Sequence, residues 1–274
     1  MAEPLELLYE AEGLATFDLP EELERLYGGR FGLVPPLLYA NFVETLDGVV
    51  AIRSEPRTNR LVSGDSDADR FVMGLLRACA DTVLLGSGTL HGSPGSIWTA
   101  ERAYPDAADT FAELRRRLDL GPEPELAVLT ASGALEPGHP ALRHGALVLT
   151  TADGAARCRR ELPEAVEVVA LDGGSSVDPA AAVSFLRGRG RRSILSEAGP
   201  HVFSSLLAAG LVDELFLTLS PLLAGRSPLG ERLGLVEGAE LLPDRAESAR
   251  LLGVRRQGGH LFLRYALNEL SSAA

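Results

Sequence analysis

The residues best suited to chemistry lie in two short glycine-containing segments, each between an apolar run and a helical pattern. The first contains Gly86, Ser87 and Thr89; glycine there lets backbone amides approach a phosphate, although a purely structural turn fits equally well. The second, residues 196–200, ends in a proline suited to a first helical turn, and the unpaired amides of a helix start bind anions. Within it, Glu197 has two interpretations: a residue of an anion site, or a helix-capping carboxylate.

The spacing of these glycines excludes the common dinucleotide-binding fingerprint. G-x-G-x-x-G must open a helix, whereas the third glycine here, Gly92, comes one residue late and Pro94 interrupts the helix. The five histidines form no H-E-x-x-H set, and the sequence contains no G-x-S-x-G elbow, Walker loop or zinc-deaminase signature. We therefore predict no metal site and disfavour metal-dependent hydrolysis.

Three further groups of polar residues are ambiguous from the pattern alone. Asp47 is able to supply or orient a proton, but Leu-Asp-Gly is also an ordinary turn sequence. Arg77 follows an apolar pair on a predicted helix, so it either emerges at a cleft and binds a phosphate bidentately or forms a surface salt bridge. Arg53, Arg57 and Arg60 form either an anion clamp or a solvated run of charge.

Composition limits the partners and the compartment. The 274 residues carry a formal net charge of −12, which disfavours nucleic acid and anionic membranes as partners. Cys79 and Cys158 lack metal-ligand spacing and suit a reducing compartment, and the acidic start does not resemble a signal peptide. Charges and a proline interrupt the longest apolar stretch, residues 206–223, so it does not fit a membrane span. We expect a cytoplasmic protein.

Apolar periodicity predicts strands that alternate with helices. The predicted strands cover residues 37–43, 81–86, 125–130, 146–151, 165–171 and 192–195, with another after the helix that follows residue 200. Helices are predicted over residues 67–80, 107–118, 153–161 and 179–187. Residues 249–256 and 261–267 are predicted to form a C-terminal hairpin. The alternation indicates an α/β fold with a mostly parallel central sheet that is closed by antiparallel strands.

The chain is divided by Pro35 and Pro36, which block helix continuation. We predict an N-terminal extension over residues 1–35 and one larger domain over residues 36–270.

Three segments, in this order, resemble the reductase domain of bifunctional riboflavin-biosynthesis proteins, which has a dihydrofolate-reductase-like fold. They are residues 41–48, 69–89 and 194–225, and the third is the most specific because it approximates the family's strand, Glu-Gly-Gly, helix and Leu-Val-Asp-Glu sequence. The extension and the second segment are most similar to stand-alone actinobacterial homologues. The resemblance implies a three-layer α/β fold and a homodimer.

The resemblance also implies NADPH as the cofactor and assigns roles to individual residues. Residues implied to bind the cofactor are Gly86, Ser87, Thr89, Glu197, Ala198 and Gly199. Asn41 and Asp47 match catalytic positions and Arg77 a substrate-binding position. The family reaction moves hydride from nicotinamide to C1 of a phosphoribosylamino-pyrimidine, while the protein mainly orients the reactants.

Two departures from the family pattern leave the substrate open. Val49 stands where Lys or Arg is usual, and Gly92-Ser93-Pro94 replaces Asp-Asp-Pro. The first hypothesis is reduction of 5-amino-6-(5-phosphoribosylamino)uracil, and the alternative is reduction of dihydrofolate or another pterin. A second alternative is a non-catalytic NADPH-binding protein.

Overall fold

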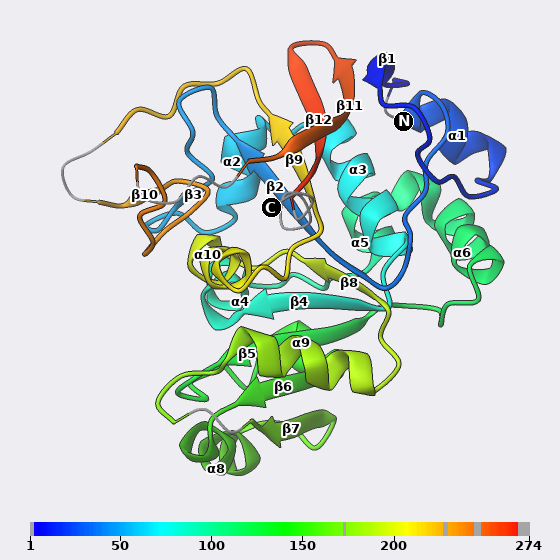
Figure 1. Cartoon of the computed structure of the whole chain (residues 1–274). Coiled ribbons are helices and arrows are strands. Elements are labelled where there is room, and N and C mark those ends of the chain that lie inside the picture. Colours follow the sequence, from blue (N-terminus) through cyan, green and yellow to red (C-terminus); the bar gives the residue numbers. More distant parts are fainter. Residues whose placement is uncertain (1–2, 172–173, 227–229, 244–247, 268–274) are drawn as a thin grey trace, which may run out of the picture.

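A large twisted sheet organises the molecule (Figure 1). The computed structural model describes residues 3–171, 174–226, 230–243 and 248–267. Within these residues, one sheet has ten strands in the order β1-β11-β12-β9-β2-β8-β4-β5-β6-β7. The strands are β1 (Glu6–Glu10), β2 (Leu37–Glu44), β4 (Thr82–Gly86), β5 (Glu125–Thr130), β6 (Ala146–Thr150), β7 (Val166–Ala170), β8 (Ser193–Ser196), β9 (Glu214–Leu219), β11 (Arg250–Gln257) and β12 (His260–Ala266).

The sheet is parallel from β9 through β2, β8, β4, β5 and β6 to β7, and antiparallel at its other end. There β11 and β12 form the C-terminal hairpin, which pairs with β9 on one side and with β1 on the other. The predicted mostly parallel sheet and its antiparallel C-terminal hairpin are therefore confirmed.

Successive side chains of a strand point to opposite faces of the sheet. The apolar residues of the buried strands therefore form two cores, one on each face. In β4, Val83 and Leu85 join one core and Leu84 joins the other, because neighbouring residues of a strand point to opposite faces. Helices cover both faces, which gives the predicted three layers. On the first face lie α1 (Glu21–Tyr27), α3 (Asp67–Ala78), α5 (Ala100–Ala103), α6 (Ala108–Arg117), α7 (Pro140–His144) and α8 (Ala152–Glu161). On the second lie α9 (Pro179–Gly188) and α10 (Pro200–Ala208).

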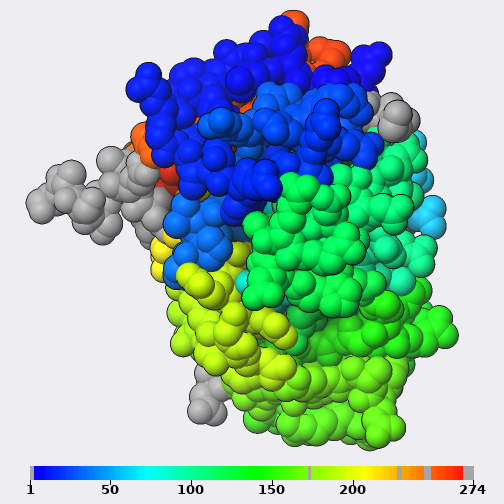
Figure 2. All heavy atoms as spheres, turned by 90° about the vertical axis from the view of Figure 1, so that its right-hand side faces the viewer, coloured from blue at the N-terminus to red at the C-terminus, as the bar shows by residue number. Residues whose placement is uncertain are grey.

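The segment before residue 36 packs onto this sheet. β1 extends it by pairing with β11, and the Leu5 amide donates to the Leu26 carbonyl at 2.9 Å. The Arg255 guanidinium, 3.8 Å from the Tyr27 ring centroid, also pairs with Glu10. Figure 2 shows the blue N-terminal segment lying against the green α6 region, where Thr110 donates to Glu22 at 2.6 Å. The segment thus shares the domain's core, while its predicted separation as an extension stays a prediction.

Short elements depart from the predicted pattern. The apolar run after Gly48 forms β3 (Ala51–Ile52), which pairs with β10 (Arg232–Leu233) in a small antiparallel sheet. The described residues also contain α2 (Thr58–Ser63), α4 (Ser87–Gly92) and the 3-10 turn η1 (Pro105–Ala107). α4 is not among the predicted helices, because Ser and Gly give a weak helical signal in sequence.

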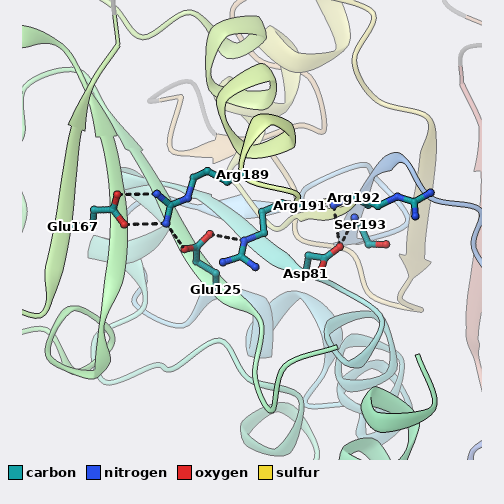
Figure 3. A network of polar contacts seen from close by, with 7 residues as sticks. All are labelled: Asp81, Glu125, Glu167, Arg189, Arg191, Arg192 and Ser193. Carbon is teal, nitrogen blue, oxygen red and sulfur yellow. Dashed lines mark hydrogen bonds and ion pairs between the residues drawn. The ribbon is translucent and has the colours of Figure 1, made fainter. Parts of the chain in front are cut away.

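Polar contacts tie together the amino ends of four parallel strands (Figure 3). Arg189, just before β8, pairs bidentately with Glu167 of β7 at 2.8 and 3.0 Å. Arg191 pairs with Glu125 of β5 at 3.1 Å. The carboxylate of Asp81, at the start of β4, accepts the backbone N–H groups of residues 192 and 193 at 2.9 and 2.8 Å. These contacts fix the strand ends opposite the edge where α4 and α10 begin.

Candidate functional site

The two glycine-containing segments meet at the carboxyl edge of the sheet. β4 and β8 are parallel neighbours, so α4 and α10, which follow them, start side by side. The Glu197 amide donates to the Leu84 carbonyl at 3.1 Å, which joins the second bend to the end of β4. A Cβ placed on Gly199 would lie 3.4 Å from the Thr89 hydroxyl oxygen. The bends are therefore in contact, as parallel strand ends with a shared edge require.

Both bends open onto one cavity of about 790 Å³, a size typical of small-molecule sites. All six residues implied to bind the cofactor line it: Gly86, Ser87, Thr89, Glu197, Ala198 and Gly199. Asn41, one of the two predicted catalytic residues, also lines it from β2. The structure thus brings seven of the nine predicted site residues to one place, while their roles stay predictions.

The cavity wall suits an anionic dinucleotide. Gly199 is the N-cap residue of α10 and has no side chain to cap this helix, so the start of the helix is available to an anionic group. No described atom lies within 4 Å of a Cβ placed on Gly88, so this bend leaves room for a ligand to approach the backbone. The hydroxyls of Ser87 and Thr89 add donors beside it.

Arg77 lies beneath the cavity wall instead of in it. It is 6 % exposed and is not among the described residues that line the cavity. Its Nε and Nη2 atoms donate to the two Glu197 carboxylate oxygens at 2.9 and 2.6 Å, and Nη1 donates to the Thr99 carbonyl at 3.2 Å. Direct substrate binding by Arg77 stays a prediction; its contacts support an indirect role, in which it holds the Glu197 carboxylate.

Asp47, the other predicted catalytic residue, lies outside the described cavity wall. Its carboxylate accepts the Thr45 hydroxyl at 2.6 Å and the backbone N–H groups of Ala224 and Gly225 at 3.0 and 2.7 Å. The hydrogen bond from Thr45, followed by those from the backbone, lowers the pKa of Asp47 to about 2. These contacts fasten the turn at Gly48 to the segment after β9; the catalytic role of Asp47 stays a prediction.

Asp69 is a cavity residue that the sequence analysis missed. It lies in the first turn of α3, is 7 % exposed and lines the cavity. Burial raises the pKa of Asp69 to about 6, against the opposing effect of a hydrogen bond with Thr218. A signal was present in the sequence: Asp69 is three residues before Val72 and seven before Leu76, both buried, so helical spacing puts a carboxyl on the apolar face.

The two departures from the family pattern differ in position. Val49 is fully buried and is not among the described cavity-lining residues, so it contributes to packing. Gly92 and Ser93 line the cavity, so their loop contacts any ligand that fills this side.

Residues 36–246 match the RibD C-terminal domain family. The chain belongs to this family. A relative from Archaeoglobus fulgidus, 2,5-diamino-6-ribosylamino-4(3H)-pyrimidinone 5′-phosphate reductase, is 28% identical over 195 residues, which cover 69% of this chain and 82% of the relative. The resemblance to riboflavin-biosynthesis reductases is thus confirmed.

Solved structures of RibD-type proteins share the fold. A pyrimidine reductase-like protein from Corynebacterium diphtheriae superposes with a TM-score of 0.67 and 19% identity, over 91% of this chain and 95% of that one. The deaminase/reductase from Thermotoga maritima gives a TM-score of 0.63 and 21% identity, over 85% of this chain and 57% of that one. The predicted fold class is confirmed by these similarities together with the sheet topology.

Membrane-spanning helices and metal-binding clusters are both absent from the described residues. None of the helices there is long and apolar enough to cross a membrane. No group of three or more His, Cys, Asp or Glu side chains there is arranged to hold a metal ion.

Proposed function

We propose that the protein is a pyrimidine reductase that uses a reduced nicotinamide dinucleotide, NADPH, on a phosphoribosylamino-pyrimidine. One observation carries this proposal: the bends after β4 and β8 touch each other and open onto one cavity that also contains Asn41 and Asp69. A cavity with an anion-binding edge and a few polar groups in an otherwise apolar wall fits a dinucleotide beside a nitrogen-rich ring. The named activity of the Archaeoglobus fulgidus relative supports the substrate class.

The cofactor would lie along the two bends. The amides of Ala198 and Gly199 and the hydroxyls of Ser87 and Thr89 would hold its phosphates. When bound, this group supplies the hydride, so the protein's task is to place the acceptor carbon correctly. Good alignment of two reactants lowers a barrier by roughly 7–11 kcal/mol in favourable cases. Asn41 has both an amide donor and a carbonyl acceptor with which to orient a ring in the cavity.

A phosphate group on the substrate needs a cationic side chain to bind it, and few such side chains are present near the cavity. The sequence contains no lysine. Among the described residues that line the cavity, Arg53 is the one arginine. Its Nη2 atom is 2.9 Å from His201 Nε2, so two groups able to bind a phosphate lie together at the wall. We assign the substrate phosphate to this pair. Homodimer formation remains a prediction from the family resemblance, and a cytoplasmic location remains a prediction from the composition.

Loss of nicotinamide absorbance under three substrate conditions tests the proposed function. The protein is mixed with NADPH, or with NADH as a comparison, and then with 5-amino-6-(5-phosphoribosylamino)uracil, its 2,5-diamino-pyrimidinone counterpart or dihydrofolate. We expect turnover of a phosphoribosylamino compound and tighter binding of NADPH. Turnover of dihydrofolate alone would overturn the assignment in favour of a pterin reductase. Binding of NADPH without turnover of any of the three would favour the non-catalytic alternative.

A further inference from the structure

Three carboxyl groups line the cavity, those of the exposed Glu55, Asp69 and Glu197, and the surroundings of the last two differ. Glu197 accepts both Nε and Nη2 of Arg77, so its oxygens are already engaged by a guanidinium. The Asp69 carboxyl instead forms a hydrogen bond with the Thr218 hydroxyl. Paired acidic groups in contrasting environments take different chemical roles, one as an ionised binding group and the other as a proton carrier.

We propose that Asp69 is the acid that protonates the substrate during its reduction. This inference rests on the proposed function and adds to it the proton donor that the hydride transfer needs.

The atoms balance as follows. The Asp69 proton goes to the ribose ring oxygen as the C1–O bond breaks and its electron pair stays on that oxygen. The lone pair of the substituent nitrogen forms a C1=N bond, which carries a positive charge. Hydride from the reduced nicotinamide adds to C1, and the C=N π electrons return to nitrogen. One proton and one hydride are consumed, C1 is reduced and nicotinamide is oxidised; Asp69 then regains its proton from solvent.

The charged and titratable groups around Asp69 come from three parts of the fold. Glu197, after β8, favours a protonated Asp69, whereas His260 at the start of β12 and Arg70 on α3 favour its ionised form. His260 is held by its Nε2 contact with the Ser63 carbonyl at 2.9 Å, and Arg70 forms ion pairs with Asp67 and Asp65. Burial outweighs the effects of His260 and Arg70, and it keeps the pKa of Asp69 raised to about 6. A group that titrates close to neutral pH both donates and regains a proton readily.

The decisive experiment compares Asp69→Asn with the wild-type protein in turnover and in a direct titration. We expect kcat for the phosphoribosylamino substrate to fall by at least about a hundredfold, the lower end of what general acid catalysis contributes. NADPH affinity should be unchanged. Wild-type kcat should decrease as the pH rises through the pKa of Asp69, and Asp69→Asn should lose this limb of the profile. Asp69→Glu should restore part of the rate.

Asp67→Asn is the matched control, because Asp67 belongs to the same helical turn but is not among the described residues of the cavity wall. It should keep the wild-type rate and pH profile. The direct measurement is carbon-13 NMR of the aspartate carboxyl carbons, in which Asp69→Asn identifies the signal that disappears. We expect that signal to titrate near pH 6 instead of the ordinary 3.8.

Two results would overturn the role of Asp69: a carboxyl signal that titrates at the ordinary value, or an Asp69→Asn protein with wild-type kcat and the wild-type pH profile. Failure of the proposed function gives a different result. In that case the wild-type protein reduces no phosphoribosylamino compound, while the NMR titration still shows whether Asp69 retains a proton near neutral pH.

Discussion

Arg77 and Glu197 form a buried bidentate ion pair that joins α3 to the bend before α10, across 120 positions of sequence. Glu197 lines the cavity and Arg77 does not, so Arg77 holds the Glu197 carboxylate from behind the cavity wall. In sequence, Arg77 is a candidate for binding a ligand, but in the fold its guanidinium is paired with the Glu197 carboxylate.

The first prediction concerns this pair. Arg77→Met should reduce the free energy of unfolding by about 3–5 kcal/mol, because it leaves a buried carboxylate without its partner. The double variant Arg77→Met/Glu197→Leu should recover much of this loss, since apolar groups of similar size need no counter-charge. Urea unfolding of both variants makes the comparison. If the single and double variants lose the same free energy of unfolding, the unpaired Glu197 carboxylate is not the cause of the loss.

The second prediction tests the cofactor edge. Gly88→Val places a side chain in open space beside the bend, where no described atom lies within 4 Å of the added Cβ. The dissociation constant for NADPH should rise at least about tenfold, while the melting temperature changes little. Gly188→Val, at the end of α9, meets equally open space but is not among the described cavity-lining residues. This control should bind NADPH as the wild type does. Fluorescence titration of NADPH measures both.

The third prediction separates close packing from backbone strain in the N-terminal segment. Gly13 and Gly28 both have a φ near +75°, at +77° and +74°. A Cβ at Gly13 has no described neighbour within 4 Å, whereas one at Gly28 would lie 2.0 Å from the Leu5 carbonyl oxygen. Gly13→Ala should cost about 1–2 kcal/mol of stability, and Gly28→Ala about 1–3 kcal/mol more. Similar unfolding free energies for the two variants would contradict the tight packing of Leu5.

The fourth prediction tests the substrate phosphate. Arg53→Ala should raise the KM for the phosphorylated substrate about tenfold and leave that of the dephosphorylated compound nearly unchanged, because the lost interaction is with the phosphate. Arg57→Ala is the control, since Arg57 is exposed nearby and is not among the described residues of the cavity wall. Steady-state kinetics with both compounds provide the measurement. If Arg53→Ala raised the KM of both compounds equally, Arg53 would not be the residue that binds the substrate phosphate.

The fifth prediction follows from the buried Asp69 carboxyl. Its pKa is raised from 3.8 to about 6, so between these values the unfolded chain loses a proton that the folded protein keeps. This contribution lowers stability as the pH rises through that window, and the loss is complete above the folded pKa. Asp69→Asn should therefore gain up to about 3 kcal/mol over the wild type at pH ~8, and the gain should vanish at pH ~3. Chemical denaturation at several pH values measures it; a constant difference would contradict the shift.

Sequence periodicity was sufficient to predict the main sheet and the helices that cover it. β2 and α3 have local apolar patterns, and the structure contains both close to the predicted bounds. β1 has the sequence Glu-Leu-Leu-Tyr-Glu, which lacks the alternation of apolar and polar residues that marks a half-buried strand, and all five residues are exposed. It forms a strand by pairing with the free edge of the distant β11. The α4 helix was missed because it begins Ser-Gly and ends in Gly, which are poor helix formers.

The part of the site that lies at strand ends could be predicted from the sequence. Gly86 and Gly199 lie at or just after the ends of β4 and β8, and the carboxyl ends of parallel strands share one edge of the sheet. The partners of the individual charges were not predictable. Arg77 and Glu197 are joined only by the tertiary fold, and the cavity position of Asp69 depends on how α3 lies against β9.

The ion pairs between Arg189 and Glu167 and between Arg191 and Glu125 lie far from the cavity, at the start of the strands (Figure 3). Ion pairs at the amino ends of the strands hold the strand register even when the loops at the carboxyl ends change in sequence. Loops such as Gly92–Ser93 are therefore free to diverge among related proteins, and new ligand preferences can evolve on this scaffold without a cost to the strands that support them.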